Sequence, residues 1–221
     1  MAGKTINQGK KSTAKLARAK TKTETEIKMG RPRAFREDTA LDAAMRVFWE
    51  KGYEGTSLDD LTAAMGINRS SLYATFGDKE ALFRGAAARY AEGPVSYIQK
   101  ALEQPTARAV IEALLRGTAE VLGDTSHPRG CLLLQSGLTC GSGAESVKQA
   151  LIDWRRNAGA AIENRMKRGR RDGDLAPNVD PRDLARYVSI VMNGLAVQAA
   201  NGATKSEMTR AVGLVLRTLP L

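Results

Sequence analysis

Apolar residues along most of the chain recur with the spacing of amphipathic helices. Leu41, Ala44, Met45, Phe48 and Trp49 fall at positions i, i+3, i+4, i+7 and i+8, which places them on one helical face, and a glycine three residues later is a typical left-handed stop. The sequence contains no stretch with the two-residue period of a strand and no internal repeat. The pattern therefore predicts an all-α protein.

Two very short helices are predicted after this first one. Ser57 and Asp60 have the spacing of a capping box at the start of a segment that ends at Gly66, and Asn68 caps the next segment, with Leu72 on its inner face. Helices of barely two turns are marginal in isolation. We therefore expect tertiary packing to hold them, in an arrangement that serves something outside the core.

The rest of the chain is predicted to continue as helices. Asp78 caps a fourth helix, which runs to a break at Gly93-Pro94. Further helices are expected over residues 107–123, in the segment CLLLQSGLTCG, and over 144–171, 181–200 and 205–218. These elements predict a helical unit over residues 34–92 and a second helical domain over 93–221.

Positive charge is concentrated at the N-terminus. The net charge is +10, but residues 1–33 contain ten Lys or Arg and two Glu, so the remaining chain carries only +2. These residues include few large apolar side chains, a composition typical of a disordered basic arm. A basic arm suits nucleic acid, although an inert tail would have the same composition.

Other compositional features narrow the class of protein. The longest mostly apolar run, VSIVMNGLAVQAA, is too short and too polar to span a bilayer, and two cysteines without a secretory signal indicate a reducing compartment. We therefore expect a cytoplasmic protein without a membrane partner. Two Cys and one His without paired spacing predict no metal site, and we expect no cofactor.

The short helices around the MGIN segment are typical of a helix-turn-helix, whose second helix enters the DNA major groove. Arg69 can pair with guanine, and the methyl group of Ala74 can meet thymine. Ser57, Tyr73 and Lys79, near helix starts, suit phosphate oxygens. A simple helical corner in a bundle is the alternative interpretation.

The stretch TALDAAMRVFWEKGYEGTSLDDLTAAMGINRSSLYATFGDKEALF resembles the DNA-binding domain of the tetracycline-repressor (TetR) family of bacterial one-component regulators. The resemblance runs from about Arg36 to Tyr90. Many members carry Gly or Pro where Ser70 stands, and an aromatic or His pair where Ala74 and Thr75 stand, so the operator sequence stays open. The predicted DNA-contacting residues are Arg36, Ser57, Asn68, Arg69, Ser70, Ser71, Tyr73, Ala74, Thr75 and Lys79.

The resemblance implies a ligand pocket and a dimer interface in the second domain. The predicted pocket residues are Tyr97, Leu133, Gln135 and Trp154, which mix apolar bulk with polar groups, although core packing would explain each of them. The predicted dimer residues are Leu184, Val188, Val191, Leu195, Ala199, Val212 and Val215, although an intrachain core is the alternative.

Catalytic and redox functions have weak signals. His127 and Cys131 could form a base and a thiol nucleophile, but Pro128 and Gly130 lie between them and no acidic partner is evident. We therefore predict no enzyme activity. A redox role for Cys131 or Cys140 stays open.

Together these features predict a homodimeric transcriptional repressor that binds a palindromic double-stranded DNA operator and is released by a small apolar inducer. The alternative is a sequence-tolerant DNA-packaging protein that acts through its basic arm.

Overall fold

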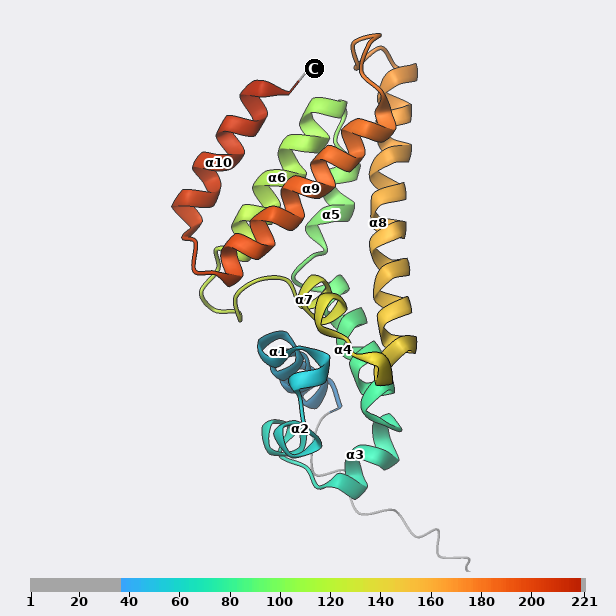
Figure 1. The fold of residues 1–221 in the computed structure, drawn as a ribbon, viewed down its shortest axis with the longest axis vertical. Helices are drawn as coiled ribbons and strands as arrows, with labels where there is room; N and C mark the ends of the chain where they lie inside the picture. The colour runs from blue at the N-terminus through green and yellow to red at the C-terminus, as the bar shows by residue number, and fades with distance from the viewer. Residues whose placement is uncertain (1–36, 220–221) are drawn as a thin grey trace, which may run out of the picture. The chain divides into compact units, whose positions relative to one another are not determined.

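The computed structural model describes residues 37–219, which contain ten α-helices, one short 3-10 helix and no strand (Figure 1). The predicted all-α fold class is confirmed. The predicted basic arm at residues 1–33 and the predicted DNA contact Arg36 lie outside the described residues.

The N-terminal helices follow the predicted caps. They are α1 (Glu37–Gly55), α2 (Leu58–Met65), α3 (Arg69–Phe76) and α4 (Lys79–Glu92). Gly52 has a φ of 71°, which confirms the predicted left-handed position, although helical structure resumes as far as Gly55. Asp78 caps α4 by accepting from the backbone N–H of Ala81 at 2.7 Å.

The C-terminal helices agree with the predicted ranges, with one addition. They are α5 (Tyr97–Leu102), α6 (Ala107–Leu122), α7 (Leu132–Thr139), α8 (Glu145–Arg171), α9 (Pro181–Ala200) and α10 (Lys205–Thr218). Helix α5 was not predicted, because six residues are too few to show a helical period. Its position depends on α6, where Gly117 leaves room for the Tyr97 ring and Thr118 bonds the Tyr97 hydroxyl at 2.8 Å.

Two hydrophobic cores organise these helices. One joins α6, α9 and α10 to the C-terminal half of α8, and these helices lie side by side in Figure 1. The other contains the buried faces of α1 to α4 together with Leu132 and Leu133 of α7 and Leu151 of α8. The N-terminal helices therefore share their core with α7 and α8 and do not pack as a separate unit.

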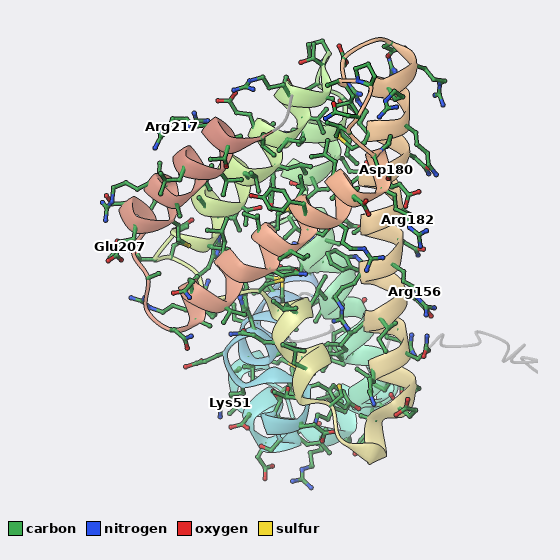
Figure 2. All side chains as sticks on the ribbon, turned by 45° about the horizontal axis from the view of Figure 1, so that its top comes forward. Lys51, Arg156, Asp180, Arg182, Glu207 and Arg217 are labelled. Carbon is green, nitrogen blue, oxygen red and sulfur yellow. The ribbon has the colours of Figure 1, made fainter. Side chains whose placement is uncertain are left out.

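Charged side chains cover the outside of the helices. Figure 2 shows Arg156 on α8 and Arg182 on α9 pointing away from the ribbon, with Glu207 near the start of α10 and Arg217 near its end. Glu207 closes a capping box with Thr204, which confirms that α10 starts where predicted. Within residues 37–219, no helix is long and apolar enough to cross a membrane.

Candidate DNA-binding site and ligand cavity

Backbone geometry and capping build the tight turn between α2 and α3. The Ser57 hydroxyl accepts from the N–H of Asp60 at 3.1 Å, and the Asp60 carboxylate accepts from the N–H of Ser57 at 3.0 Å. Gly66 ends α2 with a φ of 65°, and Asn68 starts α3 by accepting from the N–H of Ser71 at 2.8 Å. The chain can therefore reverse between two helices of eight residues each.

Helix α3 buries one large anchor and presents its other side. Leu72 is fully buried against the N-terminal core. Arg69, Ser70, Tyr73 and Ala74 are exposed, whereas Ser71, Thr75 and Phe76 are partly buried. Tyr73 keeps 49% of its surface exposed. The face predicted for base contact is thus on the surface.

Some of the predicted DNA-contacting groups already have partners within the protein. An Arg69 guanidinium nitrogen lies 2.8 Å from Oδ1 of Asp59 on α2. The Ser70 hydroxyl donates to Asn68 Oδ1 at 2.7 Å, and this oxygen also caps α3. Both Arg69 and Asp59 are largely exposed, and exposed ion pairs contribute little, so a nucleic acid can replace these contacts.

Two of the three candidate phosphate contacts, Ser57 and Lys79, are also engaged within the protein. The Ser57 hydroxyl both accepts from and donates to Asp60 in the capping box. The Lys79 ammonium lies 4.5 Å from the centre of the Tyr53 ring, and its partial burial lowers its pKa. Contact of Ser57 or Lys79 with phosphate stays a prediction.

A mainly apolar cavity of about 100 Å³ lies among α4, α5, α6, α8 and α9. Tyr97 and Trp154, both predicted from the sequence, line it. Leu133 and Gln135, the other two predicted pocket residues, line two other hollows, and their contact with a ligand stays a prediction. Leu133 faces an apolar groove beside α4, and Gln135 lies against Gly130, where an added Cβ would be 2.5 Å from its amide nitrogen.

The sequence interpretation missed several lining residues, of which Tyr90, Thr118 and Cys131 are the most informative. Tyr90 is fully buried on α4. Its residue type could have pointed to a polar site, because a buried tyrosine normally needs a hydrogen-bond partner for its hydroxyl. Thr118 and Cys131 reach the cavity because elements distant in sequence pack together, so no pattern of neighbouring residues could predict their place in its lining.

Three hydrogen bonds connect α1 to the segment that carries α7. Trp49 Nε1 donates to the carbonyl of Gly130 at 2.9 Å, in a buried position. Arg46 donates to the carbonyl of Ser126 at 2.9 Å, and Glu54 accepts from the N–H of Gly141 at 3.0 Å. Since Cys131 at the start of α7 also lines the cavity, this segment contacts both the cavity and the helix-turn-helix unit.

The predicted dimer residues lie mainly in the chain's own core. Those that are at least 90% buried in the single chain are Leu184, Val188, Leu195, Ala199 and Val212. Val191 and Val215 are partly buried against the same core. Contact of these residues with a second chain stays a prediction, and the five buried ones already pack within this chain and leave little surface for a partner.

The single histidine and the cysteines do not form a catalytic pair. The His127 ring stacks on Trp49, with 5.2 Å between ring centres, and lies 3.5 Å from Asp124, an acidic neighbour that the sequence interpretation missed. Cys131 instead neighbours Tyr90. Both cysteines are free, and burial together with Glu54 raises the pKa of Cys140, which lowers its reactivity. No cluster of potential metal ligands occurs in residues 37–219.

Comparisons with known proteins agree with this architecture. Residues 40–86 match the family model of bacterial regulatory proteins of the tetR family, and residues 105–214 match the tetracyclin repressor-like C-terminal domain. The HTH-type transcriptional repressor ComR of Escherichia coli (strain K12) is 28% identical over 193 residues, which cover 86% of this chain and 92% of ComR.

Solved structures extend the agreement to three dimensions. The TetR family transcriptional regulator CifR, solved as a cysteine mutant complexed with 26 bp double-strand operator DNA, is 43% identical with a TM-score of 0.82, over 86% of this chain and all of CifR. A putative TetR regulator from Rhodococcus sp. RHA1 is 37% identical with a TM-score of 0.58, over 82% of this chain and 97% of that one. The chain therefore belongs to the TetR family of bacterial transcriptional regulators and is a DNA-binding protein of the helix-turn-helix class.

Proposed function

We propose that this protein is a repressor that binds a two-fold symmetric operator as a homodimer and leaves it when a small molecule occupies the cavity. The observation that carries the proposal is the exposed face of α3, where Arg69, Ser70, Tyr73 and Ala74 lie at the surface while Leu72 anchors the helix. Such a face matches the geometry of a recognition helix in a major groove. Two relatives are named as transcriptional repressors, which supports repression over activation.

The proposed dimer uses the apolar surface that the single chain leaves exposed. Tyr187, Ile190 and Val197 lie along one side of α9, with 41%, 61% and 44% of their surface exposed, and Leu214 on α10 is 59% exposed. Gly194 falls on the same side of α9 and leaves room for close approach. A two-fold dimer through this face would present two copies of α3 to two half-sites.

The proposed release mechanism uses elements that contact both the cavity and the DNA-binding helices. Tyr90 lies near the end of α4, and the start of α4 is bonded to α8, where Glu80 accepts from the Ser146 hydroxyl at 2.7 Å. A ligand that separates α4 from α7 would therefore change the position of α3. To weaken operator binding a hundredfold, it must favour the released state by roughly 3 kcal/mol.

Recovery of genomic DNA tests this proposal. The full chain is incubated with fragmented DNA of its own genome at near-physiological salt, and the retained fragments are sequenced. We expect a recurring two-fold symmetric site, because two identical recognition helices read the same half-site twice. The same selection with residues 1–33 deleted should keep the site and show a smaller salt dependence.

Three outcomes would contradict the proposal. Diffuse recovery without a shared sequence would favour the DNA-packaging alternative, as would loss of all site preference on deletion of residues 1–33. A shared site without two-fold symmetry would contradict the homodimer.

A further inference from the structure

The hydroxyl protons around the cavity can be assigned one by one. Thr118 Oγ1 donates to the carbonyl of Leu114 at 2.8 Å, and Ser189 Oγ donates to the carbonyl of Ala185 at 2.9 Å. Tyr97 Oη lies 2.8 Å from Thr118 Oγ1. Because the Thr118 proton is already used, the Tyr97 hydroxyl must be the donor of that pair. None of these three protons is left for a ligand.

The hydroxyl of Tyr90 is different. Tyr90 has no exposed surface, and among the described residues its Oη has no hydrogen-bond partner. Its polar neighbours are the backbone N–H of Leu132, which is a donor and cannot accept the hydroxyl proton, and the Cys131 sulfur, which is only a weak acceptor. Burial raises the pKa of Tyr90 well above its usual value, so the hydroxyl stays protonated and remains a donor.

A buried donor without a partner costs free energy that an incoming acceptor can recover. Tyr90 and Cys131 both line the cavity, so the free donor lies at the cavity end formed by α4 and the start of α7. The start of α7 adds to this polarity, because its first N–H groups receive no side-chain cap. Both features favour an oxygen acceptor at this end.

Charge and size limit the ligand further. Among the described lining residues only Arg155 is charged, and its Nη1 donates to the carbonyl of Leu133 at 3.3 Å, on α7, beside Gly137. Leu133 and Gly137 do not line the cavity, so this hydrogen bond lies outside it. An anion at the Tyr90 end would lose its hydration without an ionic partner.

The volume of the cavity limits the size of the ligand. An engineered apolar cavity of about 150 Å³ holds benzene, so the volume here suits one small ring.

We propose that the inducer is a small uncharged molecule with an apolar body and one hydrogen-bond-accepting oxygen, such as a ketone carbonyl, which accepts a hydrogen bond from Tyr90. The assignment rests on the proposed function, because it names the ligand class of the cavity through which the repressor is released.

The test compares three ring compounds of similar size. Binding of cyclohexanone, of methylenecyclohexane, which lacks an acceptor, and of cyclohexanecarboxylate is measured by saturation-transfer NMR on the full chain without DNA. In Tyr90→Phe, the ratio of cyclohexanone affinity to methylenecyclohexane affinity should fall about threefold to tenfold, the effect of one hydrogen bond. The variant should fold, since it removes only an unpartnered hydroxyl, and thermal unfolding checks this.

Tyr97→Phe is the matched control. It removes the hydroxyl of a tyrosine in the same cavity whose proton is already used by Thr118, so the affinity ratio should stay within about twofold. An unchanged ratio in Tyr90→Phe would overturn the proposal. Tighter binding of the carboxylate than of both neutral compounds would overturn the uncharged class.

The result is separable from the test of the repressor proposal. Failure to recover a shared DNA site would remove the proposed function, while the affinity ratios would still report on the cavity. An unchanged ratio together with normal recovery of DNA would remove only the ligand class.

Discussion

At the scale of single residues, two of the α3 side chains predicted to contact DNA already have partners within the protein. Asp59 pairs with Arg69, and Asn68 holds the Ser70 hydroxyl while capping the helix. Such contacts restrict the rotamers of exposed side chains. Because they are weak, they can be replaced by contacts with a base or a phosphate at a small cost in free energy. Recognition therefore involves replacement of these contacts.

We expect Arg69→Ala to weaken binding to the selected site on the order of tenfold or more, with the loss concentrated at one base pair, because a bidentate contact to guanine is lost. Fluorescence-anisotropy titration against single-base variants of the site measures this. Arg156→Ala is the charge-matched control, since Arg156 lies exposed on α8 in the C-terminal bundle (Figure 2). Uniform weakening across all variants would show that Arg69 contacts phosphate instead.

At the scale of elements, the stability of helices as short as α2 and α3 depends on the capping contacts at their ends. The Asp60 carboxylate accepts from the Lys51 ammonium at 2.6 Å and from the Ser57 N–H and hydroxyl. These contacts lower the pKa of Asp60, and the hydrogen bond from Lys51 has the largest effect. Asp60 therefore joins α2 to α1 as well as capping it.

This cap predicts a pH dependence of stability. Because the folded-state pKa of Asp60 is depressed, its contribution is present above the unfolded value of about 3.9 and is lost as the pH falls further. We expect Asp60→Asn to be less stable than the unmodified protein at pH 7, with the difference shrinking below about pH 4. Urea unfolding followed by circular dichroism at each pH measures it.

Asp59→Asn is the matched control for this experiment. It makes the same charge change in the first turn of α2 but leaves the capping box intact. If it reproduced the whole effect of Asp60→Asn, the stabilisation would come from charge near the helix start and not from the cap.

At the scale of the whole molecule, the distribution of apolar residues on α9 points to a second copy. Leu184, Val188 and Leu195 face the chain's own core, whereas Ile190 and Val197 face outward. A helix that is apolar on both sides is expected to be covered on both. The proposed dimer would cover the outward side.

Ile190→Glu should therefore convert a dimer into single chains, because it places a charge in the proposed apolar interface. Multi-angle light scattering at micromolar concentration measures the mass. Leu138→Glu is the control, since Leu138 is 70% exposed on α7 and outside the proposed interface. A dimer that survives Ile190→Glu would place the interface elsewhere.

The sequence by itself determined the features that depend on neighbours within about four residues. The caps at Ser57, Asn68 and Asp78 and the left-handed Gly66 each act over a single turn, so the helix-turn-helix could be predicted before any tertiary contact was known. Helical periodicity likewise gave the other predicted helices, since each buries one face. It could not show α5, whose six residues complete no repeat.

Tertiary structure decided which face of each helix meets which partner. Tyr90 and Leu133 are both buried, yet only Tyr90 lines the cavity, and on α9 the stripe of Leu184, Val188 and Leu195 faces the chain's own core. The physical reason is that burial is set by contacts between residues far apart in the chain, such as that of Trp49 with Gly130. The free hydroxyl of Tyr90 is likewise visible only when every neighbouring donor and acceptor is in place.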